Sequence, residues 1–363
     1  MKNTFGTSVS VTLFGESHGP EIGAVLDGLA PGLAVDEAYI AAKLALRRPY
    51  GRISTGRVEP DPFRIVSGVF EGKTTGTPLA ILIPNTQQRS GDYQRGPARP
   101  GHADYTAYVK YHGFEDYRGG GHFSGRITAP LVAAGAIVTH ALAGRGICIG
   151  THISRMAGVA DAPFTDYQKE VPALAEKQFA VLDDGAGARM QAAAEQAAEA
   201  GDSVGGVLET VVTGLEAGLG EPWFDTVEGI LSHALFSIPA VKGLEFGDGF
   251  AMAEGNGSTV NDGFYAAGDG VRTRTNHNGG INGGISNGMP LVFRTAVKPT
   301  PSIFKAQQTV DLLTGEETEL SLKGRHDPCI VHRARIVQDS ITALVLCDLL
   351  AMRHGTDWLN PAL

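Results

Sequence analysis

Two histidines stand in polar, glycine-flanked segments of the kind that carry catalytic side chains. His18 lies in Phe-Gly-Glu-Ser-His-Gly, directly after the alternating run SVSVTLF, so we expect it at the end of a strand. His102 lies in Arg-Pro-Gly-His-Ala-Asp, close to Arg99, where proline and glycine interrupt the chain before a helical pattern. An arginine this near disfavours the imidazolium unless an anion lies between the two side chains. One such histidine would more often be structural, but two favour proton transfer.

The segment RGGGHFSGRITAP, residues 118–130, has the properties of an anion site. It runs from a glycine loop through Ser124, a good N-cap, into an apolar helix. Main-chain N–H groups at a helix start attract anions, whereas the helix dipole opposes a cation there. Arg126 in the first turn therefore indicates a bound anion. The alternative is a tight turn that needs glycine for its backbone alone.

Two later segments carry further groups for phosphate or proton chemistry. KPTPSI, residues 298–303, supplies an ammonium and two hydroxyls around two prolines, a set that could hold a phosphate. GRHDPC, residues 324–329, places an arginine, a histidine and an aspartate in an extended segment before proline. Each is nonspecific by itself, and a surface turn is the alternative for the second.

The charge is distributed unevenly along the 363 residues. The whole chain has a formal charge of −9, which disfavours a general nucleic-acid-binding surface. Residues 47–126, however, hold ten arginines and two lysines against seven acids. Arginine rather than lysine favours planar, bidentate recognition of carboxylate or phosphate. An exposed face of ion pairs remains the alternative for this basic segment.

Several familiar signatures are absent from the sequence. GVFEGKT, residues 68–74, has three residues between its glycines where a P-loop needs four, and no segment carries the GxGxxG spacing of a dinucleotide fold. The histidines form no HExxH motif, and the three cysteines form no CxxC pair. We therefore expect no metal, and a reducing, cytoplasmic compartment.

Helical and strand patterns mix without regular alternation, which favours an α+β fold of one domain, residues 1–363. Helices are expected at 36–48, 128–144, 188–201 and 338–355, and strands at 63–70, 78–84, 205–214 and 289–297. The apolar run ITAPLVAAGAIVTHALA falls short of a membrane span and contains a histidine, so a buried core helix is expected instead. The N-terminus shows no signal-peptide pattern.

Taken together, the motifs resemble the chorismate synthase family. GESHG, RPGHADY, DYRGGG, GDSVGG, IPAVKGLEFGDGF, GGISNG, KPTPSI and GRHDPC occur in the order typical of that family and span nearly the whole chain. The resemblance implies an α+β sandwich of two antiparallel sheets flanking central helices, assembled as a homotetramer. It also implies a lyase that converts 5-enolpyruvylshikimate 3-phosphate to chorismate and phosphate by 1,4-elimination, with reduced FMN and no net redox change.

The same resemblance implies a role for individual residues. His18 would protonate the departing phosphate, His102 would act on the reduced flavin, and Asp327 would help to take the proton that reaches the flavin. The substrate's anionic groups would be clamped by Arg48, Arg52, Arg57, Arg99, Arg126 and Arg325. The FMN site would be lined by Ser124, Ala240, Gly283, Lys298, Thr300, Ser302 and Arg325.

The sequence departs from the family in one of these segments. His122-Phe123-Ser124-Gly125-Arg126 stands where Arg-Ser-Ser-Ala-Arg is usual, so one cation and one hydroxyl near the flavin are missing. Two other functions stay open on the sequence: an FMN-dependent oxidoreductase that consumes NAD(P)H, and a noncatalytic anion- or RNA-binding protein. The aromatic content of 7%, without interleaved basic and aromatic residues, argues against RNA.

Overall fold

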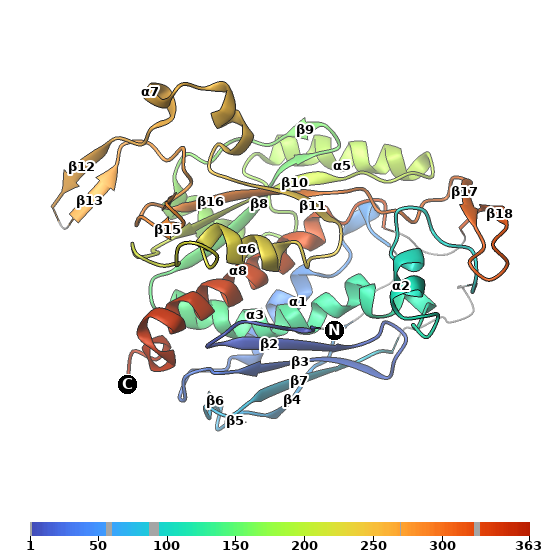
Figure 1. Ribbon diagram of the computed structural model, residues 1–363, viewed down its shortest axis with the longest axis horizontal. Helices are drawn as coiled ribbons and strands as arrows, with labels where there is room; N and C mark the ends of the chain where they lie inside the picture. Colours follow the sequence, from blue (N-terminus) through green and yellow to red (C-terminus); the bar gives the residue numbers. More distant parts are fainter. Residues whose placement is uncertain (1, 56–59, 87–93, 269, 323–326) are drawn as a thin grey trace.

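The computed structural model describes residues 2–55, 60–86, 94–268, 270–322 and 327–363. Two five-stranded antiparallel sheets lie on either side of a pair of central helices, so the predicted α+β class is confirmed (Figure 1). The first sheet has the order β1-β2-β3-β7-β4. Its strands are β1 Thr4–Phe5, β2 Ser10–Gly15, β3 Glu21–Asp27, β7 Leu79–Pro84 and β4 Arg64–Ser67.

The second sheet has the order β11-β16-β10-β8-β9. Its strands are β11 Val241–Phe246, β16 Leu291–Val297, β10 Gly206–Thr213, β8 Cys148–Met156 and β9 Val159–Ala160. Four of these strands align one charged or titratable residue each in a single row: His152, Glu209, Arg294 and Glu245 are cross-strand neighbours. The row alternates in sign, which is the favourable arrangement for cross-strand pairs.

The two central helices are α3 Thr128–Ala143 and α8 Val331–His354. The inner faces of both sheets bury apolar side chains against them, such as Ile22, Ile81 and Phe293. The helix α3, with the turn before it, is long and apolar enough to cross a membrane, but 78% of that stretch is buried within the protein. This is the pattern of a core helix, as expected from the sequence.

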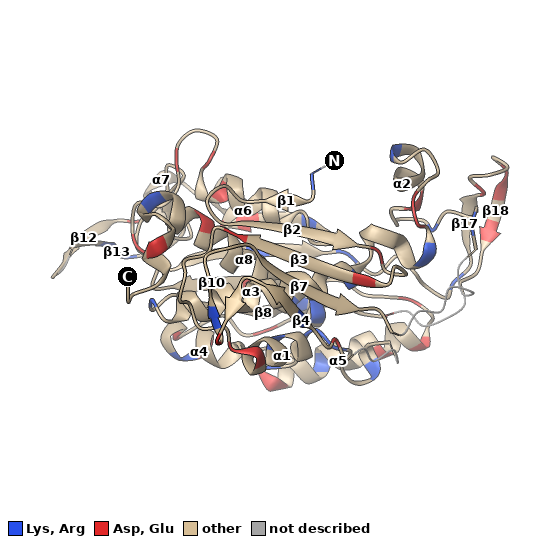
Figure 2. Cartoon of the chain, turned by 90° about the horizontal axis from the view of Figure 1, so that it is seen from below, with Lys and Arg blue, Asp and Glu red and all other residues tan. Residues whose placement is uncertain are grey.

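The remaining elements lie around this sandwich. The helices are α1 Glu37–Leu46, α2 Asp104–Lys110, α4 Tyr167–Leu174, α5 Asp184–Glu199, α6 Val227–Leu235 and α7 Gly257–Val260. Short hairpins are β5 Val69–Phe70 with β6 Lys73–Thr74, β12 Phe264–Ala267 with β13 Gly270–Thr273, β14 Ile281–Asn282 with β15 Ile285–Ser286, and β17 Gln307–Val310 with β18 Glu317–Leu320. Single 3₁₀ turns include Gly51–Ile53 and Gly125–Ile127, and Arg118–Phe123 is an irregular 3₁₀ segment interrupted by its glycines. Figure 2 shows few charged residues on the outer face of β2, β3 and β7, and many on α1, α4 and α5.

The chain's N-terminal segment is fastened to its last long helix. The buried carboxylate of Asp348, on α8, accepts hydrogen bonds from the main-chain N–H groups of Thr7, Ser8 and Val9 at 2.9, 2.7 and 2.8 Å. These amides precede β2, whose edge toward β1 is short. The carboxylate therefore satisfies three donors that the sheet leaves unpaired.

The predicted elements agree with the structure where the apolar pattern is uninterrupted. The helix α1 begins after Asp36, whose side chain accepts from the N–H of Tyr39, as its capping pattern indicates. The expected strand 63–70 is divided, because Gly68 adopts a φ of 82° between β4 and β5. The expected helix 338–355 begins seven residues earlier, at Val331, because the buried Arg335 and His332 gave that turn a polar sequence.

Candidate functional site

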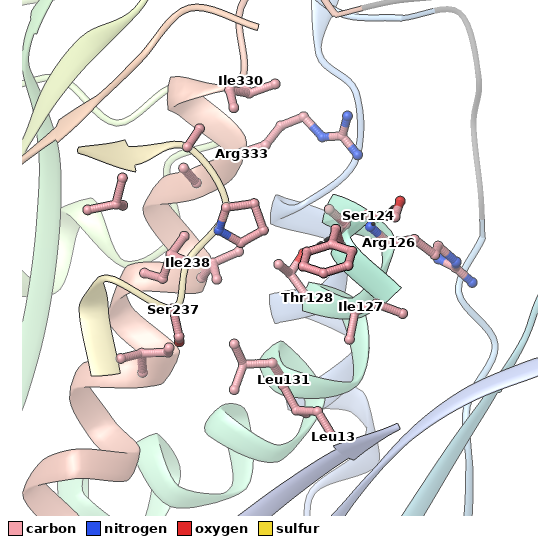
Figure 3. A pocket seen from close by; sticks show the side chains of 18 of the residues that line it. Leu13, Ser124, Arg126, Ile127, Thr128, Leu131, Ser237, Ile238, Ile330 and Arg333 are labelled. Carbon is pink, nitrogen blue, oxygen red and sulfur yellow. Dashed lines mark hydrogen bonds between the residues drawn. The ribbon is translucent and has the colours of Figure 1, made fainter. Parts of the chain in front are cut away.

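The N-terminal ends of the two central helices border a cavity of about 930 Å³ (Figure 3). One end is cationic, where Arg126 and Arg333 lie, and the other is apolar, where Leu13 and Leu131 lie. Seven lysines and arginines line it against two aspartates: Lys2, Arg47, Arg48, Arg126, Lys242, Lys298 and Arg333, with Asp61 and Asp327. This cavity therefore suits an anionic ligand with an apolar portion.

A run of three glycines packs against both predicted histidines: His102 lines this cavity, whereas His18 contacts Gly119 of its wall and is not among the residues that line it. Gly119, Gly120 and Gly121 have φ values of 60°, 81° and 54°, which glycine adopts without strain. A Cβ atom at Gly119 would lie 2.5 Å from Cε1 of His18, and one at Gly120 would lie 3.0 Å from Cε1 of His102. The glycine run thus passes directly against both imidazoles, which are far apart in sequence.

His102 is held by an ion pair within its own segment. Its Nδ1 lies 2.7 Å from Oδ1 of Asp104, and Arg99 binds the same carboxylate through Nε at 2.8 Å and Nη2 at 2.7 Å. Burial opposes ionisation of Asp104, but the hydrogen bonds from Arg99 and His102 outweigh it, so the pKa of this carboxyl lies below its usual range. Asp104 is therefore the anion expected between the arginine and the histidine.

Arg126 belongs to a buried three-residue ion cluster. Asp61, whose side chain is completely buried, accepts from Arg47 at 2.9 Å and from Arg126. Burial favours the neutral acid of Asp61, but the two arginines outweigh it and lower its pKa. Arg126 also donates through Nε to Oδ1 of Asn85 at 2.9 Å. The cluster carries a net positive charge that faces the cavity from a rigid support.

Ser124 begins this part of the chain as predicted. Its hydroxyl accepts from the N–H of Arg126 at 3.2 Å, capping the 3₁₀ turn that leads into α3. Both residues line the cavity. An arginine is tolerated at the start of this helix because the carboxylate of Asp61 compensates its positive charge.

Arg48 reaches the same cavity with donors to spare. Its Nη2 donates to the carbonyl oxygen of Pro60 at 2.6 Å. Its Nε is buried and has no hydrogen-bond partner within the described part of the chain. A buried donor of this kind is costly unless a ligand satisfies it, so Arg48 is suited to an anion in the cavity.

The segment 298–302 supplies groups that can bind a phosphate. Lys298, Thr300 and Ser302 line the cavity, and Ala240 lies beside them with a φ of 75°, its carbonyl oxygen accepting from the N–H of Lys298 at 2.9 Å. The hydroxyl of Thr300 is buried and, among the residues described, has no hydrogen-bond partner. An ammonium, a buried hydroxyl without a described partner and a second hydroxyl fit a phosphate group.

Asp327 lines the cavity beside the first turn of α8. Its Oδ1 accepts from the N–H of Thr55 at 2.9 Å, and its Oδ2 accepts from Nη1 of Arg333 at 2.7 Å. Arg333 is a site residue that sequence reasoning missed. Like Arg126, Arg333 is a cation at the start of a helix, and that pattern could have identified it. The predicted helix began at residue 338, however, so Arg333 lay outside it. Arg47, Asp61 and Lys242 were missed as well.

The structure does not bring every predicted residue to this cavity. Arg52 is 76% exposed and lies 3.8 and 3.9 Å from Glu195 and Glu199 on the surface. Gly283 lies in the turn between β14 and β15, away from the residues that line the cavity. The positions of Arg57 and Arg325 lie outside the described residues.

A second cavity of about 940 Å³ adjoins the first. The two share His102, Ala103, His122 and Phe123, and Arg99 lines only the second. Among the described residues that line the second cavity, Arg95 and Arg99 stand against five acids, which are Glu16, Asp104, Glu115, Asp116 and Glu319. The local charge therefore favours binding of an anionic substrate in the first cavity, not the second.

Comparisons with known proteins agree with the site. The family model described as chorismate synthase matches residues 9–351. Chorismate synthase of Aeropyrum pernix is 46% identical over 99% of this chain and 96% of that protein, and that of Dehalococcoides mccartyi is 46% identical over 98% of each. A crystal structure of chorismate synthase superposes with a TM-score of 0.77 at 28% identity, covering 97% of this chain and 94% of the other. A match of this length and identity leaves one assignment: the chain belongs to the chorismate synthase family.

Proposed function

We propose that the cavity between α3 and α8 binds 5-enolpyruvylshikimate 3-phosphate beside reduced FMN, and that the residues described above carry out the elimination. Membership of the family gives the reaction, in which this substrate loses phosphate and a proton to form chorismate. The cofactor, the residues and their roles are the proposal.

The observation that carries the proposal is the charge of the cavity. The substrate bears one phosphate and two carboxylates, and seven cationic side chains face the cavity against two aspartates. Arg48 offers a buried donor without a partner in the described chain, and Arg126 and Arg333 are held in place by Asp61 and Asp327. Cations fixed in this way clamp an anion without first losing the entropy of free side chains.

The two histidines supply the proton transfers. We assign His18, which is 5% exposed and packed against Gly119, as the acid that protonates the departing phosphate. His102 presents Nε2 as its exchangeable nitrogen, because Asp104 engages Nδ1. Asp327, which retains free lone pairs beside the bonds from Thr55 and Arg333, is assigned as a proton acceptor.

Lys298, Thr300 and Ser302 would hold the FMN phosphate, and Ser124 and Ala240 would lie along the same ligand. When bound, reduced FMN supplies an electron-rich ring that assists loss of the phosphate and is regenerated. His122 and Phe123 also line the cavity, so the departure from the family pattern gives this chain an imidazole and a ring beside that ligand. The Nδ1 of His122 donates to the carbonyl oxygen of Gly15 at 2.8 Å.

We propose that the chain works as a cytoplasmic homotetramer. Trp223 and Phe224 are 87% and 93% exposed in the turn between Glu221 and Asp225. Phe250 is also exposed, and the exposed Phe264 begins β12 of the hairpin that protrudes in Figure 1. Exposed aromatic side chains of this size favour burial against another copy. Gly283 would reach a flavin only from another copy, because its turn lies outside the cavity of its own chain.

The test is an assay of phosphate release under anaerobic conditions. We expect turnover of 5-enolpyruvylshikimate 3-phosphate with reduced FMN and none with oxidised FMN. Equal rates with both, or none with reduced FMN, would contradict the cofactor assignment. Consumption of NAD(P)H in proportion to product would instead support a net redox reaction.

A further inference from the structure

Arg99, His102 and Asp104 form a hydrogen-bonded cluster at the wall between the two cavities. Resting on the function proposed above, we infer that Asp104 is a positioning residue for His102, and that Arg99 supports Asp104 and does not clamp the substrate. This reassigns Arg99, which the family resemblance places among the substrate-binding arginines.

Arg99 donates several hydrogen bonds to Asp104, and both residues line the second cavity and not the first. Its main-chain N–H and its Nε both donate to Oδ2 of Asp104, at 2.9 and 2.8 Å, and its Nη2 donates to Oδ1 at 2.7 Å. The side chain of Arg99 is 11% exposed and lines only the second cavity, where acids predominate. A substrate with three anionic groups does not bind there in preference to the first cavity.

The geometry fixes which nitrogen of His102 can exchange a proton with a ligand. The ionised carboxylate of Asp104 has no proton to donate, so it accepts a hydrogen bond from Arg99 and another from His102. His102 therefore donates through Nδ1, and Nε2 remains for the ligand side, next to Gly120. Asp104 does not take this proton itself, because the two hydrogen bonds from Arg99's side chain keep it ionised.

The charge of Asp104 also offsets cations that would oppose a positive imidazole. Arg99 Nη2 lies 3.1 Å from Nδ1 of His102, and Lys298 Nζ donates to the carbonyl oxygen of the adjacent Gly101. His122 lines both cavities with His102. Without a carboxylate here, protonation of His102 would add a cation beside two others.

The first experiment separates a positioning role from a substrate clamp by comparing two arginine variants. For Arg99→Gln we expect kcat to fall at least about tenfold while KM changes by less than about twofold, because the defect is in His102. Arg48→Gln should show the reverse emphasis, with KM raised at least about tenfold. A raised KM with normal kcat in Arg99→Gln would establish Arg99 as a clamp and overturn the inference.

The second experiment removes only the charge of Asp104. Asp104→Asn should lower kcat at least about tenfold, and its pH profile should move in the direction opposite to that of Arg99→Gln, because one variant removes an anion and the other a cation near His102. The control variant for loss of an aspartate at a helix start is Asp166→Asn. Asp166 precedes α4, and its carboxylate accepts hydrogen bonds from the N–H groups of Gln168 and Lys169. This control should keep the wild-type kcat and pH profile.

A third measurement does not depend on activity. Crystal structures should show a single orientation of the His102 ring in the wild type. In Asp104→Asn they should show a rotated ring or two alternative ring conformations. An unchanged ring together with an unchanged pH profile would refute the positioning role. Failure of the wild type to turn over with reduced FMN would refute the proposed function instead, while leaving the ring orientation testable.

Discussion

The imidazole of His18 fills the space that a side chain at Gly119 would need. A Cβ atom there would lie 2.5 Å from Cε1 and 2.6 Å from Nδ1 of His18, and 2.8 Å from the hydroxyl of Ser17. The proposed acid and the glycine loop are therefore fitted to each other, although about a hundred residues separate them. Backbone conformation alone does not explain this glycine, because a steric contact with the imidazole adds to the requirement.

Replacing Gly119 with alanine should displace His18 and reduce kcat at least about tenfold. The matched control is Gly72→Ala, because Gly72 has a similar φ of 71° but nothing within 4 Å of a Cβ atom. Both variants should lose about 1 kcal/mol of stability from the positive φ. Thermal unfolding and steady-state rates measure the two effects, and equal rates in both variants would show that His18 tolerates the displacement.

Removing either histidine should slow turnover by about 10²–10⁴, the range for loss of a general acid or base. His18→Ala and His102→Ala should bind substrate nearly as well as the wild type, because neither ring is part of the cationic cluster. Single-turnover rates together with substrate titrations distinguish chemistry from binding. A variant with normal kcat and only a raised KM would place that histidine among the binding residues.

Substrate and reduced FMN should bind cooperatively. Substrate and reduced FMN are both anions, and each neutralises part of the positive charge that lines the cavity. We therefore expect FMN to bind more tightly with substrate present by about 1–3 kcal/mol. Arg48→Ala should weaken substrate binding by more than the ~0–1 kcal/mol typical of an exposed ion pair. Arg52→Ala is the matched control, because Arg52 is exposed and pairs with surface acids. Flavin fluorescence titrations with and without substrate would expose independent binding or equal effects of the two variants.

Asp61→Asn should destabilise the fold by about 3–5 kcal/mol, because it leaves Arg47 and Arg126 buried without their carboxylate. The pKa of Asp61 is lowered in the folded chain, so its contribution is present above the pKa of the unfolded carboxyl and is lost as pH falls through the folded value. Denaturant unfolding of both forms from neutral to acidic pH tests this. Asp183→Asn, at a partly exposed pair with Arg189, should change stability by at most about 1 kcal/mol.

His152 should make stability fall as pH rises above the usual histidine pKa. Burial opposes its charge, but Asp161 at 2.7 Å and Glu209 at 2.9 Å outweigh burial and raise its pKa. Because the folded pKa is the higher one, the stabilisation is complete below the usual histidine pKa and is lost as pH rises through the raised value. His152→Gln should abolish this part of the pH dependence, whereas His354→Gln, in a more exposed pair with Glu216, should leave it. Identical profiles for wild type and His152→Gln would exclude His152 as the cause.

Elements with a continuous apolar pattern could be predicted from the sequence, and those stabilised by buried polar groups could not. The helix α3 and the strands β7, β10 and β16 were expected close to their observed limits. The first two turns of α8 were not expected, because Arg335 is buried there and pairs with Asp339 at 3.1 Å. In the sequence, charged residues of a buried ion pair have the same pattern as those of an exposed turn. Tertiary contacts decided that boundary.

The site shows the same division. Arg48, Arg126, Asp327 and the segment 298–302 could be named from motifs and line one cavity, and His18 packs against Gly119 in its wall. The separation of Arg52 and Arg99 from it could not be foreseen, since both stand in the same basic segment as Arg48. Arg52 pairs with Glu195, which is distant in sequence, and Arg99 pairs with Asp104 through local backbone geometry. Neither ion pair can be read from the arginine-rich segment itself.

The hydrogen bonds from the Thr7, Ser8 and Val9 amides to Asp348 impose an order of events during translation. About 340 residues separate donor and acceptor. At the usual elongation rate of about 5–20 residues per second, the N-terminal strands wait roughly 20–70 s on the ribosome before α8 emerges. During that interval α3 can already pack on β3 and β7 of the first sheet, but the inner face of β8 and β10 in the second sheet lacks α8, which covers it. The nascent chain therefore exposes this apolar surface until synthesis is almost complete, and an early stop codon anywhere before α8 leaves a product that cannot bury it.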